Sequence, residues 1–295
     1  MAPGVRPRRS VLYMPGANAR ALEKAKTLAA DGLIFDLEDA VAPEAKATAR
    51  QQVVNAVRAG GYGQRELIVR VNALATPWGY DDLCTVARCS AHAVLLPKVE
   101  SGEAVRQALG ILAAHGAPAS LALWCMLETP RGILRAEEIA LASPQVAALV
   151  MGTSDLTKEL QAKTTRDRLP LLPSLGLALL VGRAYGLAVL DGVHLDLADD
   201  EGFTAACRQA ADMGFDGKTL IHPKTIATAN AIFAPTPDEV AWSRKIIAAH
   251  TEATAQGQGI VVVDGRLIEN LHIANAERVV RLAEAIIALE TDHSL

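Results

Sequence analysis

The sequence has few aromatic residues, few cysteines and no long apolar run. Aromatic residues make up 4% of the 295 residues although 51% are hydrophobic. The apolar mass is therefore aliphatic, which is typical of buried parallel strands packed under helices. No run approaches the ~20 apolar residues that a membrane-spanning helix needs. The formal net charge of −4 argues against bulk nucleic-acid binding. We therefore expect neither a membrane nor a nucleic acid as partner.

The four cysteines show none of the spacings that are typical of zinc sites. They are Cys84, Cys89, Cys125 and Cys207, and reduced thiols are the expected state. The basic segment Arg6–Arg9 is not followed by the apolar region of a secretory signal. These features predict a cytoplasmic protein.

Short runs rich in Val, Leu and Ile alternate with Ala-rich helical stretches. The predicted strands are Ser10–Met14, Leu33–Leu37, Leu67–Val71, Ala93–Leu96, Leu121–Leu127, Ala147–Met151, Leu187–Leu190 and Lys218–Ile221. The predicted helices between them are Asn18–Ala30, Pro43–Ala59, Gly79–Arg88, Glu103–His115, Arg131–Ala142, Leu172–Tyr185 and Asp200–Met213. Such alternation predicts an α/β fold with a parallel sheet, and eight repeats predict a closed (β/α)8 TIM barrel. A doubly wound open sheet is the alternative, but its glycine-rich fingerprint does not follow the first strand.

The chain continues beyond the eighth predicted strand. A helix is predicted at Pro237–Gln256, a strand-like run at Ile260–Val263 and an amphipathic helix at Ile273–Leu289. We therefore predict a barrel over residues 1–235 and a C-terminal helical and strand extension over residues 236–295. The extension either packs on its own barrel or reaches a neighbouring subunit.

Two acids follow successive predicted strands. Glu128 ends the fifth strand, and Asp155 comes after the sixth strand and a turn of small residues, Gly152, Thr153 and Ser154. Because parallel strands of a closed barrel direct their C-terminal ends to one face, these acids are predicted to converge. Paired carboxylates with open positions suit Mg²⁺ or Mn²⁺. The turn would leave backbone N–H groups free to bind a substrate carboxylate.

Charged residues also lie at the ends of the second and third predicted strands. Asp36 and Glu38 are two residues apart, so they share one face of an extended strand and repel each other unless a cation lies between them. Asp39 follows, and one of these three acids is expected to cap the next helix. Arg70 in the third strand needs a partner. A structural ion pair and a bidentate grip on a substrate carboxylate are both consistent with this pattern, so Arg70, Asp36 and Glu38 are catalytic candidates.

Three other features each have two interpretations. Lys98 fits a simple strand-end charge, and His222 fits a packed or capping histidine as well as a catalytic one. The first predicted helix carries Arg20, Lys24 and Lys26, which indicate either a solvated face or contact with the phosphates of a large cofactor.

Six motifs, in order along the chain, resemble the citrate lyase beta subunit and malyl-CoA lyase group of the HpcH/HpaI aldolase superfamily. They are Arg9–Gly16, Phe35–Val41, Val69–Asn72, Leu96–Lys98, Leu127–Gly132 and Gly214–Lys218. The resemblance implies a Mg²⁺-dependent carbon–carbon lyase that acts on 3-hydroxyacyl-CoA thioesters of the malyl-CoA, methylmalyl-CoA or citramalyl-CoA type. The products would be a 2-keto acid and acetyl-CoA or a homologue.

The resemblance also assigns roles to residues. It implies that Glu128 and Asp155 bind the metal and that Arg70 contacts the substrate. Members of this group carry an aspartate, often supplied to a neighbouring subunit, where this chain has Glu269. The resemblance therefore implies a homo-oligomer, a trimer or hexamer, in which Glu269 acts as a catalytic acid. The CoA moiety would contact Tyr13, Arg20 and Lys26.

Three alternative functions accompany this interpretation. The chain could be the beta subunit of a multi-subunit citrate lyase, whose substrate is carried by an acyl carrier protein. It could be a metal-dependent aldolase that joins pyruvate to an aldehyde, but the basic first helix and the extension are not needed there. It could also be a non-catalytic CoA-binding protein, which would have no need of the set Glu128, Asp155 and Arg70.

Overall fold

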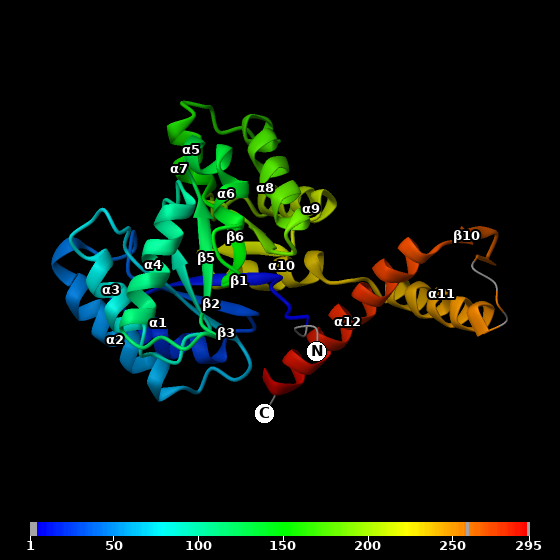
Figure 1. The fold of residues 1–295 in the computed structure, drawn as a ribbon, viewed down its shortest axis with the longest axis horizontal. Helices are drawn as coiled ribbons and strands as arrows, with labels where there is room; N and C mark the ends of the chain where they lie inside the picture. Colours follow the sequence, from blue (N-terminus) through cyan, green and yellow to red (C-terminus); the bar gives the residue numbers. More distant parts are fainter. Residues whose placement is uncertain (1–4, 256, 258–259, 294–295) are drawn as a thin grey trace. The chain divides into compact units, whose positions relative to one another are not determined.

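The computed structural model describes residues 5–255, 257 and 260–293. These residues form two compact units (Figure 1). The larger unit, Arg8–Phe233, contains all eight strands of a barrel, and the smaller unit is built mainly from the segment that begins at Ala234.

Eight parallel strands close into the predicted barrel. They are β1 (Ser10–Pro15), β2 (Gly32–Asp36), β3 (Glu66–Arg70), β4 (Ala93–Leu96), β5 (Ala122–Leu127), β6 (Val146–Met151), β7 (Ala188–Asp191) and β8 (Gly217–Leu220). Each strand pairs with the next along the chain, and β8 returns to β1 with Ser10 opposite Lys218. This order confirms the TIM barrel and excludes the open sheet.

Alternate strand residues fill the inside of the barrel. The interior cluster consists of Val11, Ile34, Ile68, Ala93, Leu95, Trp124, Met126, Ala148, Val150 and Leu190. The guanidinium of Arg8, just before β1, lies 5.2 Å from the ring centroid of Trp124. Glu66, the first residue of β3, accepts hydrogen bonds from Nε and Nη2 of Arg8 at 2.6 and 2.9 Å. Side chains therefore close the amino-terminal end of the barrel.

Helices pack against the outward-facing strand residues (Figure 1). The α-helices of this unit are α1 (Ala19–Lys24), α2 (Lys46–Ala59), α3 (Gly79–Val86), α4 (Gly102–Ala114), α5 (Pro130–Leu134), α6 (Ala136–Ala140), α7 (Thr153–Glu159), α8 (Leu172–Ala184), α9 (Asp200–Met213) and α10 (Ile226–Phe233). Short 3₁₀ turns are η1 (Ala25–Thr27), η2 (Pro43–Ala45), η3 (Leu169–Leu171) and η4 (Pro223–Thr225). In α9, a side-chain cap and a glycine explain where the helix begins and ends. The Asp199 side chain caps its first turn by accepting from the N–H of Gly202, and Gly214 ends it with φ of +102°.

Two helices were not expected, and one predicted helix is divided. The helix predicted at Arg131–Ala142 is interrupted at Arg135, whose backbone lies outside the helical region with φ of −111° and ψ of 16°. The unexpected helices are α7 and α10, of seven and eight residues. Segments of this length show too few turns for an apolar stripe to stand out in the sequence.

The smaller unit contains α11 (Pro237–Ala255), the antiparallel pair β9 (Val261–Val263) and β10 (Arg266–Ile268), and α12 (Asn270–His293). Asp264 and Gly265 join the two strands with φ of +48° and +75°, as a tight two-residue hairpin requires. The strand β10 was not predicted, although Asp-Gly between apolar runs is a strong hairpin signal. A small core of Ile246, Val263, Ile268 and Ala276 holds the unit together.

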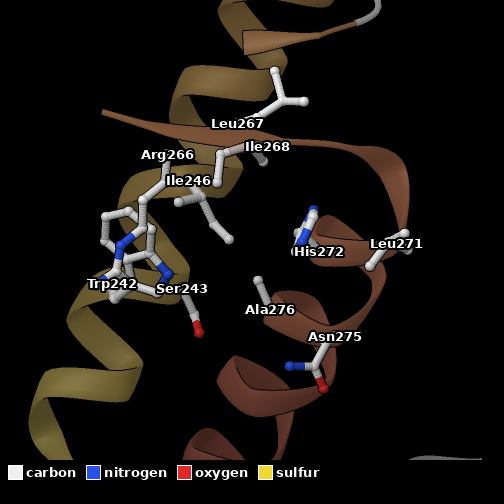
Figure 2. Close-up of a pocket in the computed structure, with 10 residues that line it drawn as sticks. All are labelled: Trp242, Ser243, Ile246, Arg266, Leu267, Ile268, Leu271, His272, Asn275 and Ala276. Carbon is white, nitrogen blue, oxygen red and sulfur yellow. The ribbon is translucent and has the colours of Figure 1, made fainter. Parts of the chain in front are cut away.

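A pocket of about 470 Å³ lies within the smaller unit, between α11, β10 and the start of α12 (Figure 2). Trp242 and Arg266 line one side, with the guanidinium 5.3 Å from the ring centroid. His272 and Asn275 of α12 line another part. None of the barrel residues predicted to form the site lines this pocket.

No helix in the described part of the chain is long and apolar enough to cross a membrane. All four cysteines are free thiols. The cytoplasmic location stays a prediction.

Candidate active site

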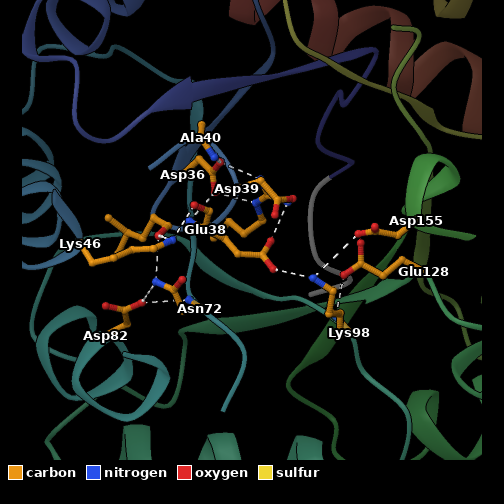
Figure 3. A network of polar contacts seen from close by, with 12 residues as sticks. Asp36, Glu38, Asp39, Ala40, Lys46, Asn72, Asp82, Lys98, Glu128 and Asp155 are labelled. Atoms are coloured by element: carbon orange, nitrogen blue, oxygen red, sulfur yellow. Dashed lines mark hydrogen bonds and ion pairs between the residues drawn. The ribbon is translucent and has the colours of Figure 1, made fainter. Parts of the chain in front are cut away.

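Charged side chains gather at the carboxyl ends of β2 to β5 and at the start of α7 (Figure 3). The structure thereby brings five predicted residues, Asp36, Glu38, Arg70, Glu128 and Asp155, into one continuous network. It lies at the end of the barrel opposite Arg8 and Glu66.

Arg70 and Asp36 form a buried bidentate ion pair. Because β2 and β3 are neighbours, these two residues lie opposite each other in the sheet. Arg70 Nε donates to Asp36 Oδ1 and Nη2 donates to Oδ2, both at 2.6 Å. The Asp36 oxygens also accept from the backbone N–H groups of Glu38 and Ala40. The predicted structural pair is therefore present, and contact of Arg70 with a substrate stays a prediction.

Glu38 shares the same guanidinium. Its Oε2 atom lies 2.9 Å from Arg70 Nη1, without the geometry of a hydrogen bond, and Asp39 accepts from Nη1 at 3.1 Å. Burial raises the pKa of Glu38, and the positive charge of Arg70 only partly offsets this. The cation expected between the Asp36 and Glu38 carboxylates is therefore Arg70.

Glu128 and Asp155 lie near each other at the barrel mouth, at the end of β5 and the start of α7. Glu128 directly follows β5 and is 2% exposed, whereas Asp155 is half-buried in the first turn of α7. Burial raises the pKa of Glu128 to about 8, and the nearby charges of Glu38 and Asp155 add to this effect. Burial and mutual repulsion disfavour the negative charges of these two carboxylates, and a bound cation would offset both effects.

Lys98 links these groups and was missed as a site residue. It follows β4, where the sequence indicated only a strand-end charge. Its backbone N–H donates to Glu128 Oε1 at 2.7 Å, and its Nζ donates to Glu38 Oε1 at 3.1 Å. The Nζ also lies 3.9 Å from Asp155 Oδ2. The only signal in the sequence was its place in one of the six motifs.

Gly152 allows Glu128 and α7 to approach each other closely. A Cβ atom added at Gly152 would lie 2.3 Å from Glu128 Cβ and 2.6 Å from its Oε2. Only glycine fits in this space. Thr153 is buried and Ser154 is exposed at the start of α7. Binding of a substrate carboxylate by these three residues stays a prediction.

The structure separates the three predicted CoA contacts. Tyr13 lies inside the barrel mouth, where the Arg70 guanidinium is 4.7 Å from its ring centroid. Its hydroxyl is buried without a hydrogen-bond partner, and burial raises its pKa. Arg20 is exposed on α1. Lys26 pairs with Glu23 at 2.8 Å and lines a pocket of about 200 Å³ between α1 and α2. Their contact with CoA stays a prediction.

Two further candidates lie outside this network. Glu269 belongs to the smaller unit, where it is exposed just before α12, and its backbone N–H donates to His272 Nδ1 at 3.0 Å. Its catalytic role stays a prediction. His222 caps the short helix η4 by accepting from the N–H of Lys224, which is the capping role considered for it.

The donor set agrees with a hard divalent cation. Within the described residues, no cluster of three or more His, Cys, Asp and Glu side chains is arranged to hold a metal ion. A metal ion at the barrel mouth would therefore have two protein ligands, the carboxylates of Glu128 and Asp155, and its other coordination positions would be free. Mg²⁺ is commonly bound in this way, by one or two carboxylates together with water and substrate oxygens.

Comparisons with known proteins place this geometry in context. A family model described as HpcH/HpaI aldolase/citrate lyase matches residues 9–223. The (3S)-malyl-CoA thioesterase of Cereibacter sphaeroides (strain KD131 / KCTC 12085) is 49% identical over 288 residues, which cover 98% of this chain and 99% of that protein. Citrate lyase subunit beta of Escherichia coli (strain K12) is 37% identical, and the match covers 95% of this chain and 94% of the subunit.

A solved structure is similar over nearly the whole chain. It is protein CitE from Mycobacterium tuberculosis in complex with magnesium, acetoacetate and coenzyme A. The TM-score is 0.76 at 30% sequence identity, and the match covers 96% of this chain and 99% of the other.

Proposed function

We propose that this chain, a member of the HpcH/HpaI aldolase/citrate lyase family, is a magnesium-dependent lyase. Its substrates would be 3-hydroxyacyl-CoA thioesters. Malyl-CoA, methylmalyl-CoA and citramalyl-CoA are the substrate types. The main support is the single network that joins the acids Glu128 and Asp155 to Arg70 at the barrel mouth. The similar CitE structure holds magnesium, acetoacetate and coenzyme A together.

In this proposal Glu128 and Asp155 hold the metal. When bound, Mg²⁺ would polarise the substrate oxygens and hold the substrate in position. The close packing of Gly152 on Glu128 keeps that carboxylate in one place. The backbone N–H of Lys98 fixes Glu128 Oε1 from another side. The protein thus holds the Glu128 carboxylate in its metal-binding orientation before any substrate binds.

The reaction breaks the bond between carbons 2 and 3 of the acyl chain. The 3-hydroxyl group loses its proton and becomes the keto group of the 2-keto acid, while the bonding electrons pass to the thioester enolate. Protonation of carbon 2 then gives acetyl-CoA or a homologue, so atoms and charge balance. Arg70 would stabilise the negative charge that develops on the substrate. The cleavage therefore needs one proton acceptor and one proton donor.

Glu38 is a better proton acceptor than Asp36. Both oxygens of Asp36 already accept two hydrogen bonds each, from Arg70 and from backbone N–H groups. Glu38 Oε2 has only its ion pair with Arg70. Asp36 would therefore orient Arg70, and Glu38 would take the hydroxyl proton. In this scheme Glu269 of a neighbouring copy donates the proton to the enolate, which requires a homo-oligomer, and a trimer or hexamer is the form we expect.

Thioester hydrolysis is a second candidate. It is favoured by the 49% identity to a (3S)-malyl-CoA thioesterase over 98% of this chain. Hydrolysis would add water to the thioester and release the 3-hydroxy acid and free CoA. Both reactions use the same substrate type, so only the products distinguish them.

The test is a product analysis of purified protein with Mg²⁺ and a panel of the three acyl-CoA types. Lyase activity yields keto acid and acetyl-CoA or its homologue, whereas hydrolysis yields hydroxy acid and free CoA. We expect EDTA and the variant Glu128→Gln each to abolish turnover. Full turnover in Glu128→Gln, or turnover undiminished by EDTA, would contradict the metal role. A chain active only on an acyl-carrier thioester would instead be a citrate lyase beta subunit.

A further inference from the structure

Lys98 lies among three carboxylates at the barrel mouth (Figure 3). Its ammonium is 3.1 Å from Glu38 Oε1 and 3.9 Å from Asp155 Oδ2. Its backbone N–H donates to Glu128 Oε1 at 2.7 Å. One residue therefore contacts both proposed metal ligands and a third acid beside them.

The backbone conformation at Lys98 favours glycine over lysine. Its φ of +50° lies in the left-handed region, which is costly for a residue with a Cβ atom and free of that cost for glycine. Glycine at this position would keep the N–H directed at Glu128. The long side chain is thus present despite the backbone, and its contribution is the ammonium near Glu38 and Asp155.

Two of the three surrounding acids have little water to stabilise their charges. Glu128 and Glu38 are 2% and 7% exposed, whereas the side chain of Asp155 is 34% exposed and faces the Lys98 ammonium at the open side of the site. Arg70 neutralises one side of the group, but two of its donors are committed to Asp36. In the part of the chain that the structure describes, Lys98 is the cation that contacts the acids on the other side.

We propose that Lys98 is an internal counter-ion of the metal site, which neutralises these acids before Mg²⁺ binds and weakens their affinity for the ion. The inference rests on the proposed metal role of Glu128 and Asp155. An ammonium and a divalent cation attracted by the same acids repel each other, and this repulsion is strong in a partly buried site. Lys98 thus stabilises the metal-free protein at the expense of metal affinity.

The test measures Mn²⁺ affinity without substrate, by electron paramagnetic resonance and titration calorimetry. Lys98→Met removes the charge at similar length, and Lys98→Gly also relieves the strain at φ +50°. Lys98→Arg retains the charge. Arg106→Met is the matched control, because it removes one positive charge from the exposed side of α4. The melting-temperature shift caused by Mg²⁺ is a second measurement that needs no activity.

We expect Lys98→Met and Lys98→Gly to bind Mn²⁺ at least about tenfold more tightly than the wild type does. Their Mg²⁺-induced melting shifts should be larger as well, while Lys98→Arg and Arg106→Met should resemble the wild type. Unchanged or weaker binding in both uncharged variants, with normal binding by the wild type, would overturn the role of Lys98 alone. Absence of binding in every chain would overturn the metal site itself, and the counter-ion role with it. If one variant fails to fold, the other decides.

Discussion

At the scale of single residues, one guanidinium organises the acids on one side of the barrel mouth. Arg70 contacts Asp36, Glu38 and Asp39, and it also lies over the ring of Tyr13. Its planar fork matches the Asp36 carboxylate with two short hydrogen bonds. The structural role of Arg70 and its proposed chemical role therefore involve the same side chain, and simple removal of the charge would not separate them.

The variant Arg70→Lys tests this dual role. Lysine keeps the charge but cannot make the bidentate pair, so turnover should fall on the order of a hundredfold. The free energy of unfolding should fall by at least about 1 kcal/mol, because Asp36 loses a buried partner. Arg166→Lys is the control, since Arg166 pairs with Asp199 and Glu201 at the surface. It should change stability by less than about 0.5 kcal/mol. Full activity and stability of Arg70→Lys would contradict both roles.

His194 gives the second prediction at this scale. Its Nε2 atom is buried without a hydrogen-bond partner. Its pKa is lowered, first by burial and then by the charge of Lys218, and Arg168 adds to this while Asp199 and Asp196 oppose it.

The sign of the pH effect follows from the lowered pKa of His194. Between the folded pKa and about pH 6.5, the unfolded chain binds more protons, so stability falls as the pH falls through this window. His194→Gln should therefore lose less stability than the wild type between pH 7 and pH 5 in urea unfolding. Both chains share the other six of the seven histidines, so the difference isolates His194. An equal loss in both would disprove the effect.

At the scale of elements, the site depends on how closely α7 approaches β5. Gly152→Ala would force a Cβ atom to 2.3 Å from Glu128 Cβ, so β5 and α7 must separate. We expect a loss of about 1–3 kcal/mol in the free energy of unfolding, together with loss of Mn²⁺ binding. Gly110→Ala in α4 is the control, because nothing lies within 4 Å of the added atom. It should stabilise the protein by about 0.5–1 kcal/mol. Normal Mn²⁺ binding by Gly152→Ala would refute the argument.

The barrel and much of the site were predictable because both depend on strand order. Once eight strands alternate with helices, their carboxyl ends must share a face, and the acids there must be near one another. Lys98 was not predictable, because its role depends on a left-handed backbone and on side chains from other strands. The same holds for a buried cluster beside β7, where Asp191 binds Arg168 Nη1 at 2.7 Å and Lys218 Nζ at 2.5 Å. Only the folded chain brings these three residues together.

At the scale of the whole molecule, the smaller unit leaves apolar side chains exposed. Val262, Leu267 and Leu271 are 64%, 53% and 66% exposed. They lie on β9, β10 and the first turn of α12, within seven residues of Glu269 in the chain. Leu267 lies opposite Val262 in the hairpin, and neighbouring exposed apolar residues are typical of surfaces that contact another protein. A second copy of the chain is the partner that the proposed function requires.

The last prediction is that two inactive variants restore activity to each other. If Glu269 serves the barrel of a neighbouring subunit, Glu269→Gln lacks the proton donor but retains Glu128, and Glu128→Gln lacks the metal ligand but retains Glu269. Mixed oligomers then contain some sites with both groups intact, so turnover should recover to about a quarter of the wild-type rate or less. Subunit exchange must be demonstrated by mass spectrometry of differently labelled chains. Glu269→Gln alone should lower turnover and leave CoA affinity unchanged, since the carboxylate is assigned to proton transfer. A monomer in solution, or no recovery despite proven exchange, would show that no site is shared between subunits.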